Sequence, residues 1–163
     1  MATTFKSALL ESRLTLNQEL GGTHVDGQKV VTDDLNETLV LDAGSTPDAA
    51  YAFHAHLAMT GSAVTIDLLD ALVDTEGNVI TMTAQKVRAI KFKNPSTANT
   101  VTIVAAASNG NLIFGASGSV VLGVGASLLL YLADSGVVID ATHCNLEATG
   151  TNGQYLDYVI VCG

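Results

Sequence analysis

Residues 87–104, with the sequence VRAIKFKNPSTANTVTIV, decide the fold class of this chain. Residues 87–93 and 100–105 form two runs rich in β-branched and other apolar residues, with polar residues between them. That pattern is typical of β-strands with one buried face. Between the runs lies the break 94–99, whose Asn, Pro and Ser residues favour a turn. The stretch therefore predicts two strands joined by a loop.

The same alternation of short apolar runs and turn formers continues to residue 163. Gly, Ser, Asn and Asp separate the runs every 8–12 residues or so, a spacing found in sandwiches and barrels. Residues 108–111 contain Asn109-Gly110, which suits the positive φ angles of a two-residue hairpin turn. Residues 63–72 fit a strand or a short helix. We predict an all-β fold, a β-sandwich or jelly-roll-like domain, with further strands near residues 38–41, 51–59, 79–82, 112–114, 119–122, 127–132, 137–140, 145–149 and 155–161.

The first 22 residues differ from the rest of the chain. Their apolar side chains fall at partly helical spacing, and Gly21-Gly22 ends the pattern. Leu14, Leu16 and Leu20 also fit the alternation of an extended strand. The segment is therefore expected to be an N-terminal arm or a short helix. We divide the chain into an arm, residues 1–22, and a single β domain, residues 23–163.

Composition limits the function classes. Apolar residues make up 48% of the chain and charged residues only 14%, against roughly 25% charged residues in ordinary globular domains. A surface so poor in charge suggests that copies of the chain or a larger assembly cover part of it. The net charge of −9 argues against a nucleic-acid partner. The most apolar run, residues 120–133, is shorter than a membrane span, and the first residues lack a signal-peptide pattern.

Few residues suggest catalysis or metal binding. His54 and His56 would share one face of a strand, which makes them weak candidates for a metal pair, although surface or interface histidines are favoured. Residues 70–77 lack the ligand order of a calcium loop. The Gly/Ser clusters at 115–119 and 123–127 match neither a nucleophile elbow nor a phosphate loop. We therefore predict a protein that is not an enzyme and holds no cofactor or metal.

The two cysteines, Cys144 and Cys162, are too few for a disulfide scaffold. We expect two buried reduced thiols, because free cysteine commonly packs as a small apolar side chain. A single bridge between them is the open alternative.

One segment gathers most of the positive charge. Four of the seven basic residues are Lys86, Arg88, Lys91 and Lys93, and none occurs in residues 94–163. On a regular strand the first two would share one face and the last two the other. This predicts an exposed or edge strand, because lysine often blocks unwanted pairing at edges. An equally weighted alternative is docking onto an acidic partner or onto the acidic N-terminal half of this protein.

Residues 86–163 resemble the capsid cement or decoration proteins of tailed bacteriophages, which are minor structural proteins of the phage head. The likeness lies in the order of four segments. The strand-break-strand VRAIKFKNPSTANTVTIV comes first and the polar hairpin SNGNLIFGASGSVVL second. The Gly-rich and aliphatic GVGASLLLYLADSGVVI follows, and TGTNGQYLDYVIVCG comes last.

This resemblance implies a homotrimeric β-sandwich or jelly-roll module on the outer surface of a virion, made in the host cytoplasm. It would bridge neighbouring major capsid protein subunits, with many weak contacts acting together. The alternative is a receptor- or carbohydrate-binding module of a phage tail or fibre, although exposed aromatic side chains are scarce. Candidate contacts with the capsid or with other copies are Phe5, Leu9, Leu10, Leu14, Leu16, Lys86, Arg88, Lys91 and Lys93.

Overall fold

The computed structural model describes residues 51–70, 82, 84–132 and 136–163, together with the strands that lie outside these ranges. The described residues contain strands and no helix, so the all-β prediction is confirmed. The strands are β1 (Ser7–Ser12), β2 (Thr15–Gln18), β3 (Val31–Asp34), β4 (Glu37–Asp42), β5 (Tyr51–Ala58), β6 (Ala63–Asp67), β7 (Leu72–Val73), β8 (Val79–Ile80), β9 (Lys86–Lys93), β10 (Val101–Ala105), β11 (Ser119–Leu122), β12 (Ser127–Tyr131), β13 (Val137–Val138), β14 (Asn145–Thr149) and β15 (Tyr155–Cys162).

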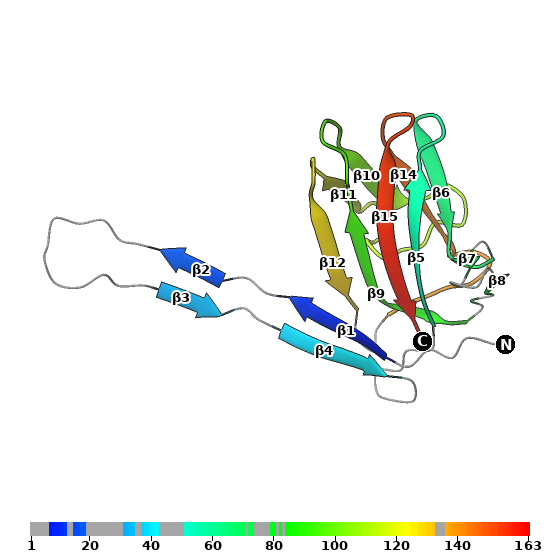
Figure 1. The fold of residues 1–163 in the computed structure, drawn as a ribbon. Helices are drawn as coiled ribbons and strands as arrows, with labels where there is room; N and C mark the ends of the chain where they lie inside the picture. The colour runs from blue at the N-terminus through cyan, green and yellow to red at the C-terminus, as the bar shows by residue number, and fades with distance from the viewer. Residues whose placement is uncertain are drawn as a thin grey trace, which may run out of the picture.

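Two antiparallel sheets form a β-sandwich (Figure 1). The front sheet has the strand order β12-β9-β15-β5, with β13 paired to the end of β9. The back sheet has the order β11-β10-β14-β6. Strands that are neighbours in a sheet are mostly distant in sequence, as β5 and β15 are. The pairs β7–β8, β1–β4 and β2–β3 stand outside these two sheets.

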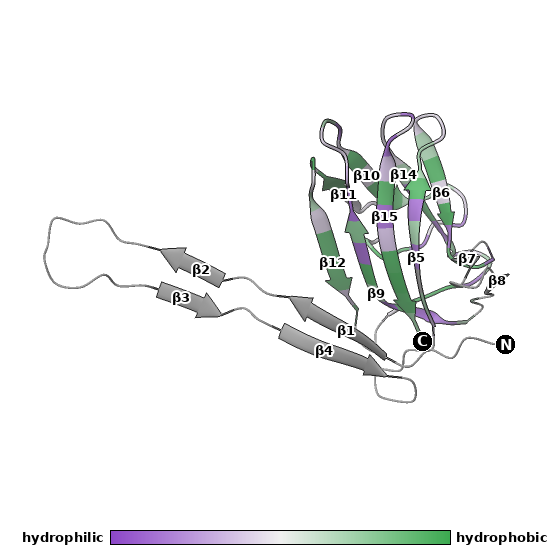
Figure 2. Ribbon diagram, viewed as in Figure 1, coloured by the Kyte–Doolittle hydropathy of each residue, from purple (hydrophilic) through white to green (hydrophobic). Residues whose placement is uncertain are grey.

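The core lies between the sheets and is largely aliphatic, as the composition predicts. Phe92 of β9 is fully buried and packs near Phe114 and Tyr158, with ring centroids 6.4 and 6.5 Å away. Hydrophobic residues are frequent along the strands of both sheets in Figure 2. Burying such side chains contributes about 1.5–3 kcal/mol each. The other large side chains with essentially no exposure are Met59, Leu68, Met82, Val87, Ile90, Ile103, Ile139, Leu146, Leu156 and Ile160.

Strands β1–β4 form a two-stranded ribbon beside the sandwich (Figure 1). Ser7 of β1 faces Asp42 of β4, and Thr15 of β2 faces Asp34 of β3, so both pairs keep one register. The helix alternative is therefore wrong for residues 7–12 and 15–18, which are strands. Because β3 and β4 pair with β2 and β1, the ribbon includes residues well beyond 22. The division into an arm of residues 1–22 and a domain of residues 23–163 stays a prediction.

Two local expectations are corrected by strand pairing. Strand β9 lies between β12 and β15, so it is not an edge strand of the front sheet. Residues 112–114 form no strand, although Asn109 has the expected positive φ of 54°. Gly110 instead bridges to Asn145 of β14, and β10 pairs with β11 and β14. Residues 112–115 form a turn in which the Gly115 amide donates to the Leu112 carbonyl oxygen at 2.8 Å, and Ile113 is buried in the core.

A buried polar cluster closes one end of the sandwich. Asn94, which follows β9, has no exposed surface. Its Nδ2 donates to the carbonyl oxygens of Asn99, Leu122 and Gly123 at 2.8, 3.2 and 2.9 Å. Its Oδ1 accepts from the Ser96 amide at 3.0 Å and from Nε2 of Gln154 at 3.1 Å. One side chain thus ties together the β9–β10, β11–β12 and β14–β15 connections.

Candidate functional site

The outer surface of the front sheet brings together residues from three strands. Antiparallel register places Lys93 of β9, Asp157 of β15 and His56 of β5 in one cross-strand row. The next row on the same side consists of Lys91, Val159 and His54. Side chains directly opposite each other in such rows have Cβ atoms about 5 Å apart. We call the surface formed by His54, His56, Lys91 and Lys93 the basic face.

Alternation along the strands explains why these side chains point outward. On β9, Ile90 and Phe92 are buried in the core while Lys91 and Lys93 are exposed. On β15, Tyr158 is buried while Val159 keeps 41% of its surface exposed. The apolar positions fix which side of the sheet packs inward, and the lysines and histidines are therefore on the solvent side.

Asp157 and Tyr155 hold His56 in place. Nδ1 of His56 is hydrogen bonded to the Asp157 carboxylate across the β5–β15 ladder. The imidazole also stacks on the Tyr155 ring, with centroids 4.1 Å apart and planes 13° apart. Lys91 and Lys93 form no ion pair with another described residue. With two lysines and one aspartate, the basic face is locally positive in a chain of net charge −9.

A shallow hollow of about 320 Å³ lies over the basic face, lined by its four residues and by Asp157 and Val159 among others. Exposed ammonium and imidazole groups can bind carboxylates or other anions. The strand spacing does bring His54 and His56 to one exposed side, as predicted. Within the described ranges, however, no three His, Cys, Asp or Glu side chains gather in a way that could hold a metal ion.

The other two predicted basic contacts differ from the lysines of the basic face. Lys86 and Arg88 are half-buried at the far end of β9. There the register shifts, with Ala89 opposite Val161 and Val87 opposite Cys162. This irregularity lets Val87, Ile90 and Phe92 all enter the core. The expected division of the four basic residues between two opposite faces is therefore wrong, because it assumed uninterrupted alternation.

The predicted N-terminal contacts are only partly within the described structure. Phe5 and Leu14 lie outside the described residues. Leu9 and Leu10 lie on β1 opposite Val40 and Leu39, and Leu16 lies on β2 opposite Asp33. Their contact with a capsid or with another copy stays a prediction.

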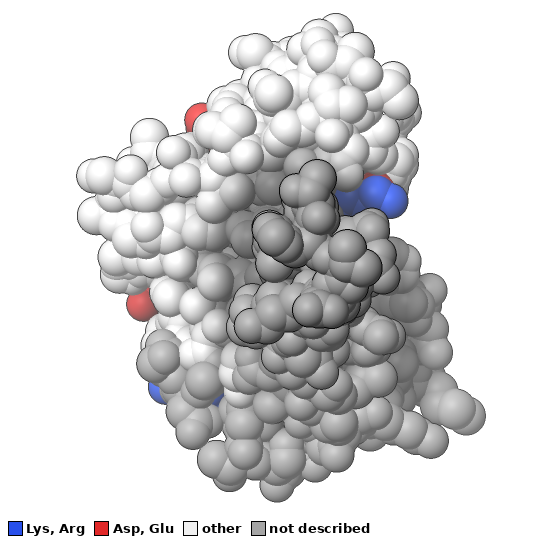
Figure 3. Space-filling model, turned by 90° about the vertical axis from the view of Figure 1, so that its left-hand side faces the viewer, with Lys and Arg blue, Asp and Glu red and all other residues white. Residues whose placement is uncertain are grey.

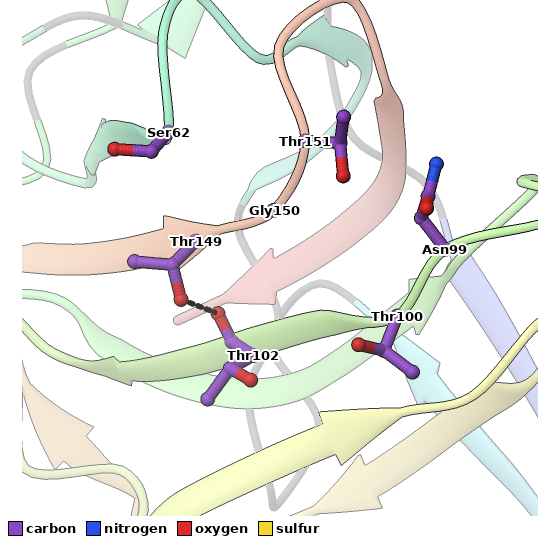
Figure 4. A pocket seen from close by; sticks show the side chains of 7 residues that line it. All are labelled: Ser62, Asn99, Thr100, Thr102, Thr149, Gly150 and Thr151. Atoms are coloured by element: carbon purple, nitrogen blue, oxygen red, sulfur yellow. Dashed lines mark hydrogen bonds between the residues drawn. The ribbon is translucent and has the colours of Figure 1, made fainter.

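A second hollow, of about 460 Å³, opens on the back sheet (Figure 4). Its side chains are short and mostly carry hydroxyls, and Oγ1 of Thr149 donates to the Thr102 carbonyl oxygen at 3.4 Å. Hydroxyls both donate and accept hydrogen bonds, so this hollow suits a neutral polar ligand better than proton transfer. Its lining is Ser62, Asn99, Thr100, Thr102, Thr149, Gly150 and Thr151.

Both cysteines are buried and unbridged, as expected. Burial raises the pKa of the Cys162 thiol to about 12, and the positive charge of Arg88 acts in the opposite direction. Burial also raises the pKa of the Cys144 thiol, and the negative charge of Asp67 adds to the effect. Because the thiolate is the reactive form, both side chains act as packing residues here.

The hydroxyl-lined hollow and the basic face escape sequence reasoning for the same reason. Each is assembled from strands that are far apart in the chain, so only the register brings its residues together. The sole signals in the sequence were the His54/His56 pair and the lysine-rich strand, read separately.

None of the described residues forms a helix long and apolar enough to cross a membrane. No protein-family model matches the chain, and no curated protein or solved structure matches it.

Proposed function

We propose that this chain is a virion structural protein, a capsid decoration or cement protein that binds the outside of a phage head and bridges major capsid subunits. It acts there as a homotrimer, without catalysis, cofactor, nucleic acid or membrane. The observation that carries the proposal is the ribbon β1–β4, which extends beside the two-sheet β-sandwich (Figure 1).

The ribbon needs a partner surface for a physical reason. It has two strands, and none of the other described strands pairs with its outer edges. Two-stranded ribbons are marginally stable in water, because they bury little apolar surface. Docking onto another molecule would supply the missing contacts, and a capsid seam between subunits offers such a surface.

The low charge of one flank supports burial in an assembly. Residues 94–133 contain no Asp, Glu, Lys or Arg, and they include both β11 and β12, the edges of the two sheets on one side. Val121 is 63% exposed and Val124 is 51% exposed. Most of the described surface on this side is uncharged (Figure 3). Solitary proteins commonly protect such edges with charge, so this flank is our candidate for contacts between copies.

The proposal is tested with assembled heads of the phage whose genome encodes the chain. We expect the full chain to sediment with heads and its binding to saturate as more protein is added. We expect it not to bind free major capsid subunits. A variant lacking residues 1–49 should bind heads at least tenfold more weakly, since it retains the sandwich but loses the ribbon. Circular dichroism of this variant controls for folding. Equal binding by a folded truncated chain would show that the ribbon is not the attachment element.

One observation favours carbohydrate binding as a second candidate function. Tyr155 is 43% exposed and lies on the rim of a hollow of about 430 Å³ that Asn99, Asn152 and Gln154 also line. Sugars stack on aromatic rings while amides bind their hydroxyls. A glycan array on which the protein binds one related set of sugars, and on which Tyr155→Ala loses that signal, would place this candidate first.

A further inference from the structure

We propose that the basic face is the docking site for the acidic strands β3 and β4 of a second copy of this chain. Each ribbon would then cross to the next sandwich and link the copies in series. The inference extends the proposed function, but it does not require a capsid, because both partners are segments of this protein.

Charge complementarity identifies the occupant. Strands β3 and β4 together carry Asp33, Asp34, Glu37 and Asp42 and no basic residue. Strands β1 and β2, on the other side of the ribbon, carry Glu11 as their one charged residue. One edge of the ribbon is therefore strongly acidic. In the described sandwich, Lys91 and Lys93 are the exposed lysines, and they stand side by side on the basic face.

The geometry of the basic face fits an extended acidic strand. Alternate residues on one strand are about 7 Å apart, so Lys91 and Lys93 present two positive charges close together on one side of the sheet. Asp33 and Asp34 are consecutive in β3, so each face of that strand offers one carboxylate to this lysine pair. Val159, 41% exposed, and Leu129, 37% exposed, lie in the same row as Lys91 and offer apolar contact. The hollow of about 320 Å³ leaves room for side chains.

The position of the ribbon favours docking between copies over docking within one copy. From Ser7 to Gln18 the ribbon spans 12 residues, which is about 40 Å of extended strand. That length exceeds the diameter of a small domain, about 30 Å. In Figure 1 the β2–β3 pair lies well away from its own front sheet, so β3 would meet the basic face of a neighbour.

The test is a charge swap in the full-length chain. One variant, K91E/K93E, reverses the basic face, and another, D33K/D34K, reverses part of the ribbon. By analytical ultracentrifugation at low salt we expect the unmodified protein to self-associate and each variant alone to associate at least tenfold more weakly. Mixing the two variants should restore association between them, because the reversed charges again match. Salt at about 1 M should weaken association of the unmodified protein, because the Debye length of that solution is about 3 Å and charges are screened beyond it.

Two controls separate docking from general charge effects and misfolding. A63E/A141E adds negative charge at two exposed positions on the side of the back sheet, Ala63 of β6 and Ala141 in the turn before β14, and should associate like the unmodified protein. K91Q/K93Q removes the two lysine charges without placing a glutamate beside Asp157. Circular dichroism reports the fold of every variant. If A63E/A141E weakens association as much as K91E/K93E, the effect is one of net charge and the inference fails.

The remaining outcomes distinguish this inference from the capsid role. A monomeric unmodified protein, or a mixture of variants that does not recover association, overturns the inference. If K91E/K93E loses head binding while the unmodified protein is monomeric, the basic face docks on the capsid instead, and the ribbon does not occupy it. If the charge swap succeeds and heads are not bound, the inference stands and the proposed function fails.

Discussion

Replacing Asn94 by alanine is expected to destabilise the sandwich more than the small size of the asparagine side chain suggests. The Asn94 side chain takes part in five hydrogen bonds of 2.8–3.2 Å, three donated and two accepted. Its two N–H hydrogens serve three carbonyl oxygens, so about four full hydrogen bonds are lost. At a net contribution of about 1 kcal/mol each, partly recovered by water entering the gap, the free energy of unfolding falls by about 3 kcal/mol.

The variant Asn94→Asp tests the reasoning more sharply, because it changes no volume. At neutral pH a carboxylate oxygen would replace Nδ2 and face the carbonyl oxygens of Asn99, Leu122 and Gly123 without a hydrogen to donate. We expect a loss at least as large as that of the alanine variant. Burial would raise the pKa of the new carboxyl group. The loss relative to the unmodified protein should therefore shrink as pH falls from neutrality toward about 4 and level off below it, where the carboxyl group is protonated in both the folded and the unfolded chain.

Urea unfolding followed by far-ultraviolet circular dichroism measures these differences as changes in midpoint at constant slope. The matched control is Asn99→Ala, which removes the same atoms from an exposed side chain in the same loop. We expect the control to change the unfolding free energy by less than about 0.5 kcal/mol. Equal midpoints for the Asn94→Ala and Asn99→Ala variants would refute the conclusion that the buried amide holds the three connections together.

Three further predictions concern backbone space and titration. A Cβ at Gly118 would overlap the backbone of the preceding turn, whereas one at Gly123 would meet nothing within 4 Å; urea unfolding should show a loss of about 2 kcal/mol for Gly118→Ala and little change for Gly123→Ala. With a pKa of about 12, the Cys162 thiol should resist a disulfide reagent at pH 8 until the chain unfolds. Its contribution to stability should be lost as pH rises from about 8.5 toward 12, because only the unfolded thiol ionises there. Hydrogen bonds from Thr142 lower the pKa of Asp140 to about 2, and NMR titration should show this midpoint. The stabilising effect of the Asp140 carboxylate should be lost as pH falls from about 4 to 2. The Asp140→Asn variant should lack this pH dependence.

Local patterns in the sequence predicted the strands well where alternation is regular. In β15, residues 156, 158 and 160 are buried and residues 155 and 159 are exposed, as an alternating run requires. Residues 119–122 and 145–149 are strands with the predicted bounds. These segments were predictable because each strand buries one face, and that requirement is written in the order of its residues.

Features that depend on distant pairing were not predictable in this way. The lysines of β9 suggested an edge strand, yet β12 and β15 flank it on both sides. The register shift near Arg88 interrupts the alternation without any Gly or Pro to mark it. The sequence placed Asn94 in a break between two strands. Its hydrogen-bond partners include Leu122 and Gln154, which are 28 and 60 residues away along the chain. Neighbouring positions in the sequence contain no information about such partners.

The contrast between the basic face and the ribbon bears on how the molecule would assemble. Strands β9 and β15 have ladders on both edges, so Lys91, Lys93 and Asp157 stand on a backbone that the sheet holds rigid. Ordering side chains on such a surface loses little backbone entropy when a partner binds. The ribbon has free backbone groups along both edges among the described strands, and its edges gain hydrogen bonds only by meeting another molecule. A rigid receptor surface and a ribbon with unused edges in one chain favour linkage between identical copies, and the charge swap tests that linkage directly.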